Sequence, residues 1–579
     1  MITNNNETTI TLARCLKDGG IEAGKDIASI FYLMPIHDTI KDDIYDVTNY
    51  EVKLIPVIAL MVTIEQIIRI IMRKQLSRFE DCFINIASSL VFTLTRVVMF
   101  TIVLRIYSWL YTNYALVHLP LHSASTWIIS LLLVEFVYYW THRALHEFNF
   151  LWAAHQFHHM AEDVNISTTI RDSVVDLVIY DIFPIPLALF IHPQILFVHL
   201  QFSLIYQIWL HNEVVGHLGP LEYLINTPRQ HRVHHGKNPY CIDKNYGALL
   251  MIWDRIFGTY QVELDEEKIV FGTVSPTPKT FDMMTLMFGY YKNVWQRFKN
   301  CDNYREKMAS LFYGPGWSPG KPRLGLIEEI PEVDHKAPRY IYTPYVAIWK
   351  KAYILFHSVA ILIGFYMIAD HPLIKFDPWK MTFCMTYLLL AITSFGALFD
   401  NRSYLIILEI FRCIVYFVFD QYVLQSTQWP VHQSTSVLIH LSLWTIRLGH
   451  LLSIMFWICM WIINLFTTNT IDDKHKSPKM TSSNEKIIYD SNEGQSQTST
   501  DSDETLHQDS TYPVRLKAST FFILMAMMVF VFVPLTMSYL FVVPSCSRYY
   551  ETYFFDRYLS FAQNITKMAN YSTLMIGGN

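Results

Sequence analysis

Long apolar runs separated by shorter polar segments dominate this chain of 579 residues. A helix needs roughly 20 mostly apolar residues to cross the hydrocarbon core of a bilayer. By that criterion the sequence predicts about ten transmembrane helices and an all-α polytopic integral membrane protein. We place the spans at 52–73, 84–110, 125–141, 174–192, 193–211, 345–369, 380–399, 403–425, 436–466 and 517–543.

The composition agrees with a membrane protein. Hydrophobic residues make up 52% of the chain and charged residues 16%, whereas soluble domains carry about 25% charged residues. The net charge is -5 and no basic block is sustained, so nucleic acid is not an expected partner. The eight cysteines form no CxxC pairs, which argues against a disulfide framework or a thiolate metal site.

The polar stretches divide the chain into five parts. The linker among them is rich in Ser, Thr, Asp and Glu and cannot bury enough apolar area to order itself, so we predict disorder there. The parts are an N-terminal segment (1–50), a membrane-embedded core (51–344), C-terminal transmembrane helices (345–466), the linker (467–516), and a last transmembrane helix with its tail (517–579).

The order of the spans predicts a topology. Spans 174–192 and 193–211 form a hairpin, so the segments before and after it face the same compartment. If that compartment is the cytosol, both ends of the chain lie in the lumen. The glycosylation sequons at Asn6, Asn564 and Asn570 agree with luminal ends.

Three short stretches hold eight of the 23 histidines. Residues 142–146 read HRALH, 155–159 read HQFHH and 231–235 read HRVHH. The four-residue spacing places the outer two imidazoles of each stretch on one face of a helix. Because all three stretches lie at helix ends on the same side of the membrane, we expect their imidazoles to converge at one end of the bundle.

Converging imidazoles indicate a metal site. Neutral imidazole suits zinc, copper, iron and nickel. Because a structural zinc takes four ligands, eight histidines indicate two ions, about 3.5–4 Å apart as in other two-metal sites. His211 ends a predicted span on the same side and is a ninth candidate. The expected ligands are His142, His146, His155, His158, His159, His211, His231, His234 and His235.

Other polar residues near the boxes and in the spans leave alternatives open. Glu147 follows His146 directly and can orient a ligand or relay a proton; it can equally be an acid at the membrane interface. Whether His217 is a ligand stays open. Glu65 and Arg69 lie four residues apart in a predicted span, which indicates an intrahelical ion pair.

The three histidine boxes resemble the fatty acid hydroxylase and sterol desaturase superfamily of non-haem di-iron membrane oxygenases. Over about 125–262 the flanking sequence is most similar to its alkylglycerol (glyceryl-ether) monooxygenase family. Glu135 stands where that family carries an aspartate. The similar segments are YYWTHRALHE, WAAHQFHHMAEDVNISTTIR, WLHNEVVGHLGPLEYLINTPRQHRVHHGKNPYCIDKNYG and WDRIFGTY.

The resemblance implies an oxygen-dependent monooxygenase whose catalytic core is 51–344. Its position beside His146 makes Glu147 the candidate catalytic residue. The metal would be two iron ions, since zinc has no redox chemistry, and the reductant would be tetrahydrobiopterin. The substrate would be a membrane alkylglycerol, hydroxylated at its ether-bearing carbon to give a fatty aldehyde and glycerol or a lyso-lipid. The enzyme would lie in the endoplasmic reticulum membrane with its active site facing the cytosol. No residue identifies a pterin pocket.

Two other interpretations remain open. A sterol or fatty acyl hydroxylase or desaturase of the same superfamily would share every metal ligand. A membrane metal transporter could also cluster histidines, but transporters bind their ions near the bilayer midplane on broken helices. The boxes here instead lie beyond the aromatic residues at 138–140, which mark the membrane surface.

Overall fold

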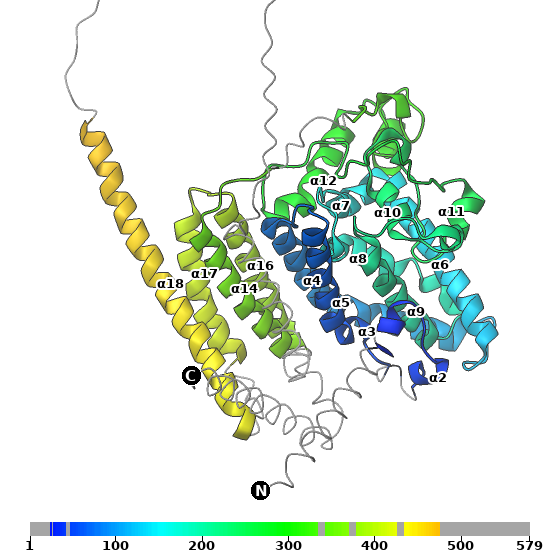
Figure 1. Ribbon diagram of the computed structural model, residues 1–579, viewed down its shortest axis with the longest axis horizontal. Helices are drawn as coiled ribbons and strands as arrows, with labels where there is room; N and C mark the ends of the chain where they lie inside the picture. Colours follow the sequence, from blue (N-terminus) through cyan, green and yellow to red (C-terminus); the bar gives the residue numbers. More distant parts are fainter. Residues whose placement is uncertain are drawn as a thin grey trace, which may run out of the picture.

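The computed structural model describes residues 24–474 except 26, 42–43, 45–46, 334–341, 370–377 and 425–432. Within these residues the regular structure is helical, with only two isolated β-bridges. The long helices stand side by side and form a broad bundle (Figure 1). The predicted all-α class is therefore confirmed.

Three long helices begin the core, and each matches a predicted span. They are α4 (Ile55–Ile71), α5 (Phe79–Tyr114) and α6 (Ala124–Glu147). The third helix continues beyond the end of its predicted span at 141, and this extension carries the first histidine box. Two short helices, α2 (Ile36–Thr39) and α3 (Tyr50–Lys53), precede α4 in the chain.

The predicted hairpin 174–211 is present, but its helices are shorter than expected. Helix α8 (Val174–Ile182) has 9 residues and α9 (Pro193–Tyr206) has 14. Because Pro184 and Pro186 lack a backbone N–H, the chain leaves the α-helix there and forms a 3-10 turn, η3 (Ile185–Leu189). A second 3-10 turn, η4 (Gln207–Leu210), follows α9. Neither helix reaches the roughly 20 residues of a full span.

The C-terminal half is a bundle of four long helices that packs on the core. It consists of α14 (Ile348–Ala369), α16 (Pro378–Phe399), α17 (Leu405–Phe419) with a π turn η8 (Asp420–Leu424), and α18 (Gln433–Lys474). Helix α16 joins it to the core, because Phe395 and Phe399 contact Phe83 of α5 edge-on. The two halves thus share one hydrophobic core.

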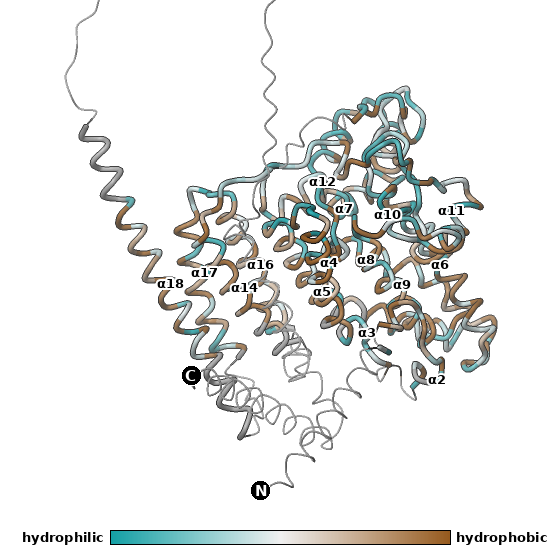
Figure 2. The backbone as a smooth tube through the Cα atoms, viewed as in Figure 1, coloured by the Kyte–Doolittle hydropathy of each residue, from teal (hydrophilic) through white to brown (hydrophobic). Residues whose placement is uncertain are grey.

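A polar layer covers one end of the core bundle. Figure 2 shows hydrophilic backbone gathered around α10 and α11, while the helices beside α4 and α5 are largely hydrophobic. The helices of this region are α7 (Asn149–His159), η2 (Ile166–Ile170), η5 (Gly219–Tyr223), α10 (Pro228–His235), η6 (Pro239–Cys241), α11 (Ile252–Phe257), α12 (Met283–Asn300), α13 (Tyr304–Phe312) and η7 (Ile327–Glu329).

Three stretches among the described residues are long and apolar enough to cross a membrane. They are Ala124–Glu147, Trp379–Phe399 and Leu443–Asn464. The chain is therefore built with membrane-type helices, whereas the ten predicted spans are not confirmed. Helix α18 continues to Lys474, past the predicted linker boundary at 467. The rest of that linker, the span 517–543 and the three sequons lie outside the described residues.

Candidate metal centre

The first two histidine boxes lie on consecutive helices that meet at a sharp corner. His142 and His146 share one face of the last turns of α6. The helix stops because Phe148 is extended, and α7 begins at the next residue with the second box in its last two turns. The side chain of Asn149 donates to the carbonyl of Ser310 at 2.9 Å and fixes this corner. Both boxes are buried.

The third box forms the short helix α10. Neighbouring residues determine where this helix begins. Pro228 occupies the first turn, where a backbone N–H has no partner within the helix, and Thr227 and Gln230 form a capping box. His211 immediately follows η4 and is also buried. The two segments are adjacent, because the Nε2 atoms of His211 and His231 lie 2.8 Å apart.

All nine predicted ligands converge, and they divide into two groups. In each group one nitrogen per residue lies within 4.8 Å of the nitrogens of all the others, and every member is buried. The first group comprises His142, His146, His155, His159 and His234. The second comprises His158, His211, His231 and His235.

In the second group the nitrogens have the spacing of ligands that share one ion. The Nε2 atom of His211 lies 3.1 Å from that of His158 and 3.0 Å from that of His235. The Nε2 atoms of His231 and His235 are 3.1 Å apart. Two nitrogens bound at about 2.1 Å to one ion would be about 3.0 Å apart at a right angle and about 3.4 Å apart at the tetrahedral angle.

The other ring nitrogens of this group define the tautomers. The Nδ1 of His158 lies 3.3 Å from the carbonyl of Arg171, and that of His211 lies 3.1 Å from the carbonyl of Gln207. Carbonyls only accept, so each Nδ1 carries the proton. Each Nε2 therefore presents a lone pair, and the two lone pairs face each other. This arrangement fits a bound cation and does not fit a hydrogen bond.

The first group is oriented in the same way. The Nδ1 of His142 lies 2.8 Å from the carbonyl of Tyr246, and the Nδ1 of His234 lies 2.9 Å from the carbonyl of Lys244. The Nε2 atoms of His146, His159 and His234 are buried and have no hydrogen-bond partner among the described residues. Buried nitrogens without a partner are costly, so this donor set also fits an ion.

The loop that supplies both carbonyls has an unusual backbone. Asp243 and Asn245 each have φ 57°, a left-handed conformation that is uncommon for residues other than glycine. The side chain of Asn245 holds the loop by donating to the carbonyls of Gln230 (3.0 Å) and Gln261 (2.7 Å). Asp254, from the WDRIFGTY segment, accepts the next backbone N–H groups, those of residues 246 and 247, at 2.8 Å each. This segment therefore fixes the carbonyls that orient two histidines.

Three carboxylates near the histidines were not anticipated from the sequence. Asp172 lies 3.5 Å from the Nδ1 of His158 and Asp176 lies 3.7 Å from that of His155. Asp243 lies 3.8 Å from the Nδ1 of His146. These separations are longer than hydrogen bonds, so the acids contribute negative charge beside the imidazoles and do not fix their orientation. Only Asp243 lies within a similar segment, the one that contains the third box; Asp172 and Asp176 follow the end of the segment that contains the second box.

Burial keeps the imidazoles outside the membrane helices neutral. Loss of hydration lowers the pKa of His211 to about 4 and that of His234 to about 3. It also lowers the pKa of His158, His159 and His235 well below the usual value, and neighbouring histidines add to the effect. At neutral pH these side chains are in the form that binds metal.

Comparisons with known proteins agree with this site. The fatty acid hydroxylase family model matches residues 127–259, which contain all three boxes and His211. The model of the alkylglycerol monooxygenase C-terminal domain matches residues 350–437. The human alkylglycerol monooxygenase is 38% identical over 401 residues, 68% of this chain and 88% of the relative. The chain belongs to the alkylglycerol monooxygenase family.

Members of this monooxygenase family from other vertebrates are about as similar. The Xenopus tropicalis protein is 36% identical over 71% of this chain and 91% of its own length. The Danio rerio protein is 40% identical over 58% of this chain and 74% of its own length. No solved structure matches the chain. The family assignment makes the chain an oxidoreductase of the monooxygenase type.

Glu147 and His217 lie outside both histidine groups of this monooxygenase. Glu147 is buried and its carboxylate accepts from Arg143 at 2.7 Å and from Arg323. Its catalytic assignment stays a prediction. His217 has a side chain that is 60% exposed, and its Nδ1 lies 2.8 Å from Glu222.

Two buried acids of the core helices hold the segments around the boxes. Glu65 and Arg69 form the predicted ion pair at 3.2 Å, and Arg69 also donates to the carbonyl of Val164 at 2.7 Å, just after the second box. Glu135 accepts from the N–H groups of Leu249 and Leu250 at 2.9 Å each. Glu135 thus ties α6 to the segment after the third box.

Proposed function

We propose that this chain is a di-iron monooxygenase that hydroxylates the ether-bearing carbon of 1-O-alkylglycerols. The hydroxylated product is a hemiacetal, which falls apart to a fatty aldehyde and glycerol or the corresponding lyso-lipid. Tetrahydrobiopterin is the proposed reductant. The observation that carries the proposal is the convergence of nine buried histidines into two groups, in a chain similar to alkylglycerol monooxygenases over most of its length.

Each histidine group would hold one iron ion. Imidazole nitrogen is a good ligand for iron, and the first group offers five such nitrogens and the second four. Iron would supply the redox chemistry that activates dioxygen, which zinc lacks. The hydrogen bonds that Nδ1 atoms of both groups donate to carbonyls support this assignment, because they leave the lone pairs of these rings on the Nε2 atoms, which are free to bind an ion.

The protein's own groups would position the metals and exclude water. The carbonyls of Lys244 and Tyr246 fix two imidazoles, and burial of the nine rings keeps solvent from the centre. Glu147 is the proposed proton relay, because it adjoins His146 at the edge of the first group. Arg143 and Arg323 would hold its carboxylate in one orientation.

The proposed substrate explains the location of the site. The boxes lie where the apolar bundle meets the polar layer, so the ether oxygen of a lipid can approach the metals while its alkyl chain stays among the helices (Figure 2). We assign this end of the bundle to the cytosolic face of the endoplasmic reticulum membrane. This orientation would place both ends of the chain in the lumen, in agreement with the sequons at Asn6, Asn564 and Asn570.

A sterol or fatty acyl hydroxylase would share the histidine boxes but is less well supported. The hydroxylase model matches only 127–259, which either kind of enzyme could contain. The second match, at 350–437, is specific to the alkylglycerol monooxygenase C-terminal domain. This C-terminal match favours the ether-lipid substrate.

Incubation of membranes that contain the full chain with radiolabelled alkylglycerol, oxygen and tetrahydrobiopterin tests the proposal. We expect labelled fatty aldehyde from the wild type and from His217→Ala, and none from His234→Ala. Turnover of a sterol or fatty acyl substrate that requires a cytochrome b5 system, without aldehyde release, would establish the alternative.

A further inference from the structure

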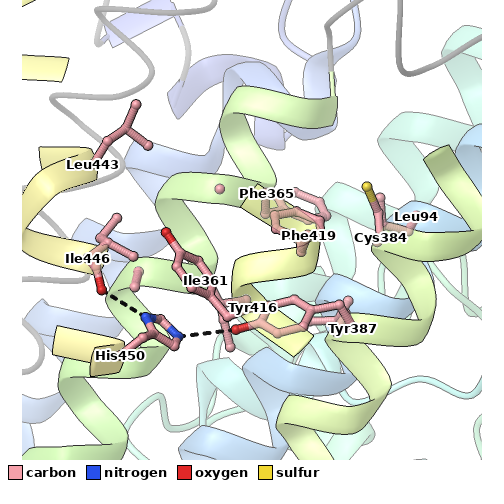
Figure 3. Close-up of a pocket in the computed structure, with 13 residues that line it drawn as sticks. Leu94, Ile361, Phe365, Cys384, Tyr387, Tyr416, Phe419, Leu443, Ile446 and His450 are labelled. Carbon is pink, nitrogen blue, oxygen red and sulfur yellow. Dashed lines mark hydrogen bonds between the residues drawn. The ribbon is translucent and has the colours of Figure 1, made fainter. Parts of the chain in front are cut away.

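A cavity lies between the C-terminal helices, apart from the histidine boxes. Its walls come from α14, α16, α17 and α18, and Leu94 of α5 closes one side. Most of the wall is apolar, formed by side chains such as Ile361, Phe365 and Phe419 (Figure 3). No charged side chain among the described residues lines it.

Three polar side chains gather at one end of this cavity, and two of them are paired. The Nδ1 of His450 donates to the carbonyl of Ile446 at 2.8 Å. Its Nε2 is therefore an acceptor, and the hydroxyl of Tyr387 donates to it at 3.3 Å (Figure 3). The ring of Tyr416 is stacked on His450, with ring centroids 3.7 Å apart and planes 10° from parallel. This stack holds Tyr416 in one orientation.

The hydroxyl of Tyr416 has no hydrogen-bond partner among the described residues, although the residue is only 4% exposed. A buried hydroxyl almost always has a partner, since losing its bonds to water costs about 1–3 kcal/mol. Because Tyr416 lines the cavity, a molecule in the cavity can supply that partner.

We propose that the cavity binds the oxygen-bearing head group and first carbons of one uncharged long-chain lipid, whose remaining chain lies in the bilayer. The head hydroxyl or carbonyl bonds to Tyr416, and the first carbons lie against Ile361, Phe365 and Phe419. A phosphate or carboxylate head would find no free counter-charge, because the guanidinium of Arg412, 3.5 Å from the Nε2 of His450, is already paired with Glu409 at 2.8 Å. Helices α16 and α18 contain stretches able to cross a membrane, so the ligand enters from the bilayer.

Two kinds of membrane lipid have the uncharged, oxygen-bearing head group that the cavity would bind. The lipid can be a long-chain alcohol or aldehyde of the membrane, or it can be an alkylglycerol like the proposed substrate. The cavity lies outside the hydroxylase-like segment 127–259 and within the part matched by the C-terminal family model or beside it. The inference therefore does not depend on the proposed reaction.

Photolabelling of the full chain in nanodiscs tests the proposal. Three diazirine-bearing probes are compared: a C16 alcohol, a C16 alkylglycerol and a C16 lysophosphatidylcholine. We expect one or both uncharged probes to label peptides of α14, α16 and α17, and the unlabelled lipid to compete. The more strongly labelling uncharged probe identifies the source. Equal labelling of these peptides by the zwitterionic probe, or no labelling by either uncharged probe, would overturn the proposal.

Two variants locate the site. Gly364 lines the cavity, and a Cβ built there meets nothing within 4 Å, so Gly364→Leu should fill the cavity and abolish the labelling. Tyr416→Phe removes one hydroxyl and should weaken competition by the unlabelled lipid about threefold to tenfold. Ile407→Phe, at a residue 68% exposed on α17, is the control and should label normally. Undiminished labelling in both cavity variants would contradict the assignment.

In the same experiment, labelling of peptides from 127–259 shows that a probe binds at the proposed catalytic centre. If those peptides are labelled and the C-terminal peptides are not, the cavity proposal fails while the proposed function stands. If only the C-terminal peptides are labelled and no aldehyde is formed, the proposed function fails while the cavity proposal stands.

Discussion

The Nε2 atoms of His158 and His235 lie 3.1 Å apart, although the two residues are 77 positions apart in the chain. The first stands on α7 and the second on α10. His158 carries its proton on Nδ1, where it faces the carbonyl of Arg171. Its Nε2 lone pair therefore points at a second imidazole nitrogen, as expected for two ligands of one ion.

Removal of one histidine from the second group should cost the protein one ion. We expect His235→Ala to lower the iron content from about two ions to about one per chain and to reduce aldehyde formation at least about 100-fold. Iron analysis and turnover assays on the purified protein measure both effects. His217→Ala is the matched control, because that exposed side chain pairs with Glu222 and belongs to neither group. Full iron content in His235→Ala would exclude His235 as a ligand.

Asn245 should control metal affinity without touching the metal. Asn245→Ala loses the bonds to Gln230 and Gln261 and places a side chain in a left-handed conformation, at a cost of about 1–2 kcal/mol. We expect iron affinity to fall about 10–100-fold, measured by competition with a chelator. Asn245→Gly tolerates the positive φ and should lose less affinity. Equal affinity in the alanine variant and the wild type would show that the loop does not orient the ligands.

The proposed proton relay at Glu147 can be separated from its ion pairs. Glu147→Gln should keep both iron ions and lower kcat about 100-fold, since general acid–base groups contribute about 10²–10⁴. Arg323→Gln leaves the carboxylate and its bond to Arg143, so its effect on kcat should be much smaller. An unchanged kcat with a lower melting temperature in Glu147→Gln would assign Glu147 a structural function only.

The C-terminal bundle should depend on one fully buried ion pair. Glu409 and Arg412 lie one turn apart on α17, 2.8 Å from each other, and both side chains are 0% exposed. Arg412→Met leaves the carboxylate unpaired and should destabilise the protein by about 3–5 kcal/mol. The double variant Glu409→Leu/Arg412→Met should regain most of that loss. Thermal unfolding in nanodiscs measures the difference, and an equally unstable double variant would argue against the pair as the cause.

The sequence predicted the nine converging histidines because helical spacing and membrane topology constrain where they can point. Four-residue spacing places His142 and His146 on one face regardless of the rest of the fold. The hairpin 174–211 returns the chain to the same side even though its helices are short. The division into groups of five and four could not be predicted, because it depends on the corner between α6 and α7 at Phe148.

The supporting structure around the histidines was not predictable from residue types. The left-handed backbone at Asp243 and Asn245 depends on tertiary hydrogen bonds. The number of spans was also hard to predict, because apolar composition does not distinguish a full span from a short helix broken at Pro184 and Pro186. Both features follow from packing, which a single sequence does not display.

Metal analysis of the purified full chain, combined with Mössbauer spectroscopy, tests the central claim most directly. Two irons per chain in nitrogen-rich coordination, lost together with aldehyde formation when a chelator is added and restored by iron(II), is the predicted result. A protein that forms aldehyde with no iron, or that holds only zinc, would contradict the account.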